Sequence, residues 1–139
     1  MTLASGARLI DDSYNASPAA VRAALQALAA TPSTGRRVAV LGEMLELGSL
    51  SDALHRECGR ATAQAGIDVL VAVGRGAARA LAEGATSAGL SATRVHVFDD
   101  SAAAADRMES LLLPGDLVLV KGSRGTRTDV IADRLAEVA

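Results

Sequence analysis

The chain has 139 residues, half of them hydrophobic, which fits one compact domain around a single buried core. A net charge of −2 without any basic run argues against a nucleic-acid-binding protein, which would need a basic face. No apolar run approaches the roughly 20 residues that cross a membrane, and the start of the sequence lacks the features of a signal peptide. The single cysteine excludes an internal disulfide. We therefore expect a cytoplasmic protein.

Short apolar segments alternate with helical ones along the chain. The apolar segments are mostly rich in Val and Leu, and their residues do not alternate between apolar and polar. This pattern is typical of strands buried on both faces of a parallel sheet. The candidate strands are residues 7–11, 37–41, 69–73, 95–98 and 117–120. At the start, two short segments flank Ser5 and Gly6, which predicts a hairpin that adds one antiparallel edge strand.

Five helices are predicted between and after these strands. The first carries Val21, Leu25 and Leu28 on one face, with Ser17 as its N-cap and Pro18 at the first helical position. The second helix is expected to be capped by Ser51, and the third to span about residues 77–88, where Gly84 weakens the helical pattern. The fourth is expected to follow Ser101, and the last to carry Ile131, Leu135 and Val138 on one face.

Strand–helix–strand units of about 30 residues with right-handed crossovers predict an α/β fold. We expect a Rossmann-like domain of three layers over residues 1–139, with a mostly parallel sheet of about six strands and helices on both faces. Ligands of such sheets bind beyond the carboxyl ends of the strands. The five strand exits are residues 11–18, 42–48, 74–76, 99–100 and 121–125.

The first exit supports two interpretations. Asp12 can accept hydrogen bonds from the hydroxyl groups of a ribose, and the helix that begins at Pro18 offers free N–H groups to an anion. Alternatively, Asp12 and Ser17 only cap the turn and the helix, which is ordinary for these residue types.

The last exit concentrates positive charge. Lys121 is the only lysine beside 13 arginines, and it is followed by Ser123 and Arg124 between two glycines. Two cations and exposed backbone N–H groups would hold a carboxylate or phosphate there. The alternative is a solvated basic turn.

Several other chemistries are not supported by the sequence. It has no G-x-x-x-x-G-K-[ST] phosphate loop, and Arg79 occupies the third-glycine position of a dinucleotide fingerprint that would begin at Gly74. His55 and His96 have no clustered ligands, so we expect no metal site. Cys58 shares the apolar face of its helix and is interpreted as a packing residue, and no nucleophile–base pair can be assigned.

Three stretches and one spaced pair resemble the MurF-type Mur ligases. Residues 10–18 are similar to I-D-D-S-Y-N-A-N-P, residues 40–48 to V-L-G-D-M-L-E-L-G, and residues 120–125 to V-K-G-S-R-G. His55 followed by Gly59 matches a further family pattern. The matches occur in the family order and span nearly the whole chain.

The resemblance implies a role within a larger enzyme. In that family, ATP converts the carboxylate of UDP-N-acetylmuramoyl-tripeptide into an acyl phosphate, which D-alanyl-D-alanine then attacks. An N-terminal UDP-sugar domain and a central ATPase domain, which holds the phosphate loop and Mg²⁺, precede the C-terminal domain. The chain is expected to be that C-terminal domain, to close over ATP and the dipeptide, and to be inactive alone.

The resemblance also implies roles for individual residues, with no catalytic residue in this domain alone. It implies nucleotide contacts by Asp12, Tyr14 and Asn15, and substrate contacts by Lys121, Ser123, Arg124 and Glu43.

Two positions depart from the family pattern. Ser17 replaces the second Asn of the first stretch, and Glu43 replaces an Asp and is one methylene longer. The family carries a Gly-Arg pair upstream of the hairpin, and the chain begins after it, so we expect Met1 to begin a truncated or split polypeptide.

Two alternatives to the ligase domain remain at the level of sequence. One is a stand-alone α/β module that binds a nucleotide or anion at the same edge. The other is a structural protein that oligomerises through its Ala-rich helices. Micromolar ATP binding by the isolated chain would favour the first, and a concentration-dependent dimer without a ligand response would favour the second.

Overall fold

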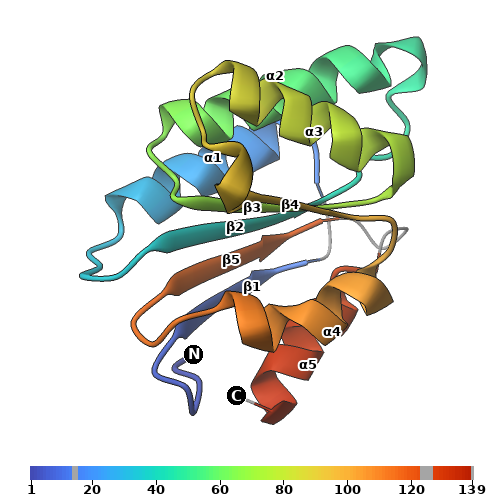
Figure 1. Ribbon diagram of the computed structural model, residues 1–139. Coiled ribbons are helices and arrows are strands. Elements are labelled where there is room, and N and C mark those ends of the chain that lie inside the picture. Colours follow the sequence, from blue (N-terminus) through green and yellow to red (C-terminus); the bar gives the residue numbers. More distant parts are fainter. Residues whose placement is uncertain (14–15, 123–126, 139) are drawn as a thin grey trace.

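The computed structural model describes residues 1–13, 16–122 and 127–138. The predicted site residues that lie outside these ranges are Tyr14, Asn15, Ser123 and Arg124. The described residues form a central sheet between two layers of helices, which confirms the predicted three-layer α/β class (Figure 1).

Five strands form the sheet, and every neighbouring pair is parallel. Each lies within one residue of its predicted bounds: β1 (Arg8–Asp12), β2 (Arg37–Gly42), β3 (Val69–Val73), β4 (Val95–Phe98) and β5 (Leu117–Lys121). The strand order is β1-β5-β2-β3-β4, so the last strand of the chain lies between the first two.

The predicted antiparallel edge strand is wrong. Thr2 forms only an isolated antiparallel bridge with Arg8, and the sheet has five strands rather than six. The backbone still turns back on itself, because the N–H of Leu3 donates to the carbonyl of Ala7 (2.7 Å) and Gly6 adopts a φ of 92°.

The helices divide between the two faces of the sheet (Figure 1). One face carries α1 (Pro18–Ala30), α2 (Ser51–Gln64) and α3 (Arg75–Ser87), and the other carries α4 (Ser101–Leu111) and α5 (Asp129–Val138). Short 3₁₀ turns, η1 (Gly48–Leu50) and η2 (Ala92–Arg94), precede α2 and β4.

Each face of the sheet has its own apolar core. Successive strand residues point to opposite faces, so Leu70 belongs to the same buried cluster as Leu25 of α1, while its neighbour Val71 belongs to the cluster that contains Met108 of α4 and Ile131 of α5. Burial on both faces explains why the sequences of β2, β3 and β5 show no polar alternation.

The predicted start of α1 is confirmed, whereas that of α2 needs a correction. Ser17 accepts a hydrogen bond from the N–H of Ala20 (3.2 Å), and Pro18 begins α1. Ser51 is the first residue of α2 and makes no cap hydrogen bond, because η1 leads directly into the helix and leaves Leu50 at the cap position.

Gly84 supports α3 instead of weakening it. α2 and α3 cross so closely that a Cβ at Gly84 would overlap the carbonyl oxygen of Arg56, and a Cβ at Gly59 would overlap that of Leu81. The absence of side chains at these two positions therefore allows the contact between the helices.

Candidate functional site

The carboxyl edge of the sheet brings together strand exits that are distant in the sequence. Because β5 lies between β1 and β2, Lys121 pairs in register with Asp12 on one side and Leu41 on the other. The chain leaves β1 and β2 toward α1 and α2, but it leaves β5 toward α5 on the opposite face. The chain thus diverges around β5, the arrangement that opens a ligand-binding crevice in parallel sheets.

Lys121 and Asp12 form an ion pair at this edge. The ammonium Nζ lies 2.7 Å from Asp12 Oδ2, and the side chain of Lys121 is only 7% exposed whereas that of Asp12 is 50% exposed. A buried ammonium requires a partner of opposite charge. The pair therefore fixes a positive charge in the sheet and keeps an accessible carboxylate beside it. The sequence placed both residues at strand ends but could not show that they touch.

Thr128 connects the segments that follow β1 and β5. It is fully buried, and its hydroxyl lies 3.5 Å from the carbonyl oxygen of Ser13. A Cβ at Gly122 would overlap the side chain of Thr128, so only glycine leaves room for it. Sequence reasoning missed Thr128, because no local pattern marks a threonine that contacts a residue 115 positions away.

Glu43 follows β2 directly and lies at the same edge. It is half-buried, and it begins the loop that leads to η1 and α2. Since β2 and β5 are neighbours, the backbone of Glu43 and that of Lys121 belong to the same end of the sheet. The described part of the candidate site thus comprises Asp12 and Lys121, the last residues of β1 and β5, and Glu43, the residue after β2.

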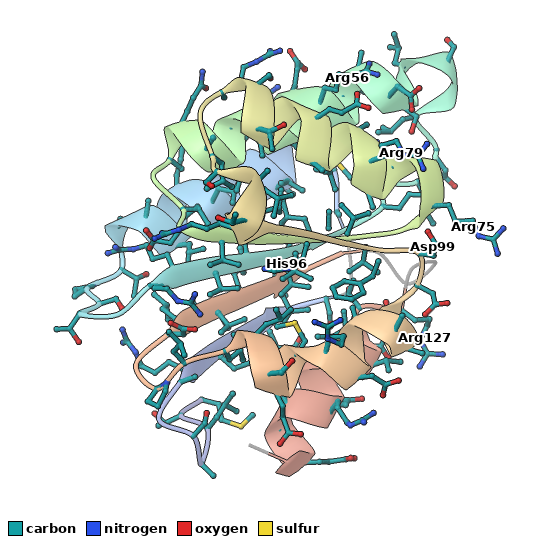
Figure 2. The ribbon with its side chains drawn as sticks, viewed as in Figure 1. Arg56, Arg75, Arg79, His96, Asp99 and Arg127 are labelled. Atoms are coloured by element: carbon teal, nitrogen blue, oxygen red, sulfur yellow. The ribbon has the colours of Figure 1, made fainter. Side chains whose placement is uncertain are left out.

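Further charged side chains lie along this edge. Figure 2 shows Arg75, Asp99 and Arg127 at the end of the sheet toward which the strands run. Arg75 is exposed at the start of α3, and Arg127 is held by Asp129 through contacts of 2.9 and 3.0 Å. The edge is therefore richer in cations than Lys121 alone implies.

Among the described residues, no group of three or more His, Cys, Asp or Glu side chains is placed to hold a metal ion. Cys58 is buried as predicted, and burial raises the pKa of its thiol to about 11, which keeps it protonated at neutral pH. Burial, with two nearby arginines, lowers the pKa of His96.

The sequence matches a known family over most of its length. Residues 1–124 match the family model described as Mur ligase, glutamate ligase domain. The chain belongs to this Mur ligase family. It is 40% identical over 151 aligned positions to the UDP-N-acetylmuramoyl-tripeptide–D-alanyl-D-alanine ligase of Mycobacterium tuberculosis (strain H37Rv), covering 96% of the chain and 29% of that relative. The chain thus spans less than a third of the length of this Mur ligase.

Solved Mur ligase structures show the same fold. MurF from Acinetobacter baumannii superposes with a TM-score of 0.83 at 34% identity, over 96% of this chain and 29% of that one. MurF from Thermotoga maritima, solved in complex with ADP, superposes with a TM-score of 0.75 at 28% identity, over 95% of this chain and 28% of that one. Among the helices in the described part of the chain, none is long and apolar enough to span a membrane.

Proposed function

We propose that this chain is the C-terminal domain of a MurF ligase, the enzyme that adds D-alanyl-D-alanine to UDP-N-acetylmuramoyl-tripeptide with ATP. The observation that carries the proposal is the Lys121–Asp12 pair at the carboxyl edge, which joins two of the motifs that resemble the family, those at the first and last strand exits. The names of the relatives and the ADP complex of one of them support it.

In this proposal the domain binds and orients, while the rest of the enzyme holds the phosphates. The tripeptide carboxylate attacks the γ-phosphorus of ATP and ADP leaves. The amine of the dipeptide then attacks the acyl carbon, phosphate leaves, and the amine loses its proton. The other domains would supply the phosphate loop and hold Mg²⁺, which compensates the charge of the phosphate oxygens. A cytoplasmic location of this enzyme remains a prediction.

The charges of the site suit the two ligands. Asp12 is exposed enough to accept hydroxyl groups of the ATP ribose, and its bond to Lys121 holds the carboxylate in place. Lys121 carries three N–H donors, so its ammonium can bind Asp12 and an anionic oxygen together. The dipeptide has an ammonium and a carboxylate, which Glu43 and Lys121 on neighbouring strands would complement.

Four further contacts remain part of the proposal. Tyr14 and Asn15 would contact the nucleotide, and Ser123 and Arg124 would contact the dipeptide or the reacting carboxyl group. They lie outside the described residues, and the proposal rests for them on the family motifs alone.

Phosphate release by the full-length ligase, with and without D-alanyl-D-alanine, tests the proposal. Lys121→Ala should nearly abolish release that depends on the dipeptide, and Asp12→Ala should raise the KM for ATP. Arg94→Ala is the matched control, because Arg94 is an exposed cation just before β4, at the opposite edge of the sheet. Normal release and normal KM values in both site variants would refute the assignment.

The isolated chain discriminates the ligase domain from a stand-alone binding module. If the other domains hold the phosphates, calorimetric titration of these 139 residues with ATP should detect little or no binding. A Kd in the micromolar range would instead favour an independent nucleotide-binding protein.

A further inference from the structure

One buried histidine determines the shape of the loop between β2 and α2, residues 43–50. His55 lies in the first turns of α2 and is 0% exposed. The backbone N–H of Met44 donates to its Nε2 at 2.9 Å, and its Nδ1 lies 2.7 Å from the carbonyl oxygen of Ser51. Both ring nitrogens are therefore occupied by backbone groups, one of which belongs to the loop.

These contacts define the position of the ring proton. A backbone N–H can only donate, so Nε2 must carry a lone pair, and a carbonyl oxygen can only accept, so Nδ1 must carry the proton. The structure thus requires the neutral Nδ1–H tautomer of His55. The hydroxyl of Ser51, 3.2 Å from Nδ1, is a second neighbour of that nitrogen.

The loop is anchored at Met44 in two ways. Its N–H is bound to His55, and its side chain is 2% exposed with Sδ 4.0 Å from Cys58 Sγ. Two residues later Glu46 has a φ of 62°, a left-handed conformation that a non-glycine residue adopts at some energetic cost. The loop is therefore attached to α2 at Met44, and Glu43 immediately precedes this anchor.

We infer that His55 is a positioning residue for the dipeptide side of the site. Its Nε2 accepts the hydrogen bond from the Met44 N–H and thereby fixes the backbone next to Glu43, just after the end of β2. This inference rests on the proposed function, because only there does Glu43 contact the dipeptide. The competing view is that His55 is a core residue whose loss lowers stability alone.

Nuclear magnetic resonance tests the hydrogen-bond arrangement in the chain itself. The ¹⁵N chemical shifts of the His55 ring at neutral pH should show a protonated Nδ1 and an unprotonated Nε2. The opposite tautomer would place a hydrogen on the nitrogen that faces the Met44 N–H, and it would overturn the inference whatever the enzyme does.

Steady-state kinetics of the full-length ligase tests the consequence for the site. His55→Leu leaves the Met44 N–H without its acceptor and should raise the KM for D-alanyl-D-alanine about tenfold or more, per unit of folded enzyme. His55→Gln offers a carbonyl oxygen to the same N–H and should stay within about threefold of the wild type. A purely structural role would reduce the amount of active enzyme and leave this KM unchanged.

Thr62→Val provides the matched control. Thr62 is as buried as His55 and lies on the same helix, but its hydroxyl bonds only to the carbonyl of Cys58 within α2 (2.8 Å). This variant should keep the wild-type KM for the dipeptide. An equal rise in KM for Thr62→Val and His55→Leu would show a general effect of core damage and overturn the positioning role.

Glu43→Ala separates failure of this inference from failure of the proposed function. If Glu43→Ala raises the KM for the dipeptide and His55→Leu does not, only the positioning role is refuted. If neither variant changes that KM, Glu43 makes no contact that His55 could position, and the inference is refuted together with that contact. An intact full-length protein without any phosphate release that depends on D-alanyl-D-alanine would refute the proposed function.

Discussion

Removing the two members of the Lys121–Asp12 pair one at a time should have unequal consequences for folding stability. Asp12→Ala leaves an ammonium that is 7% exposed without its carboxylate partner at 2.7 Å. Breaking a fully buried pair costs about 3–5 kcal/mol. Because Asp12 is half-exposed, water and salt already weaken the interaction, so we expect a loss of about 1–3 kcal/mol in the free energy of unfolding.

Lys121→Met should change stability by less than about 1 kcal/mol, although it removes the same ion pair. The substitution removes the desolvation penalty of the ammonium and keeps an apolar stem of similar length in the buried position. The double variant Asp12→Ala/Lys121→Met should for the same reason be more stable than Asp12→Ala alone.

Urea denaturation of the 139-residue chain at neutral pH and low salt measures these differences. Glu83→Gln serves as control, because it removes an exposed pair in which Arg56 and Glu83 are 46% and 51% exposed. That change should alter stability by less than about 1 kcal/mol. A Lys121→Met variant that is less stable than Asp12→Ala, or a double variant no more stable than Asp12→Ala, would refute this account of the pair.

Three further predictions concern packing and ionisation. Gly59→Ala should destabilise the chain by about 1–3 kcal/mol in thermal or urea denaturation, because the new methyl group would overlap the Leu81 carbonyl oxygen. The control Gly76→Ala should be neutral or stabilising, because the space there is open, and an equal loss of stability in this control would contradict the explanation. Cys58, with a thiol pKa of about 11, should react very slowly with iodoacetamide at pH 8 in the folded chain and quickly in urea, and fast labelling of the native chain would show that it is accessible. Burial lowers the pKa of His96 in the folded state, so its contribution to stability is present above the unfolded-state pKa of about 6.5 and is lost as the pH falls through the lower folded-state value. The variant His96→Gln should therefore show a smaller loss of stability on acidification than the wild type, and an unchanged pH dependence of stability would contradict the assignment.

The sequence alone determined the local elements and predicted the edge of the sheet where ligands would bind. Continuous apolar runs located β2, β3 and β5 to within one residue, because a strand buried on both faces needs apolar side chains on nearly every residue. Ser17 and Pro18 located the start of α1, since a cap and a fixed φ act within one turn. The polar exits after β1, β2 and β5 predicted the candidate functional edge, because parallel strands end on the same side.

Only the tertiary structure decided which of these elements are neighbours. Nothing local to residues 117–121 states that β5 lies between β1 and β2, yet that position alone makes Lys121 a partner of Asp12, 109 residues away. The glycines where α2 crosses α3 likewise depend on contacts between segments that are distant in the sequence.

His55 illustrates the same division. The sequence alone placed His55 on a helix, without other metal-ligating residues clustered around it. Its role depends on the Met44 N–H, which only the folded loop brings to Nε2. Propensity, capping and polarity act over a few residues and can be read in order along the chain, whereas strand order, ion pairs and buried side-chain hydrogen bonds arise when segments far apart in sequence pack together.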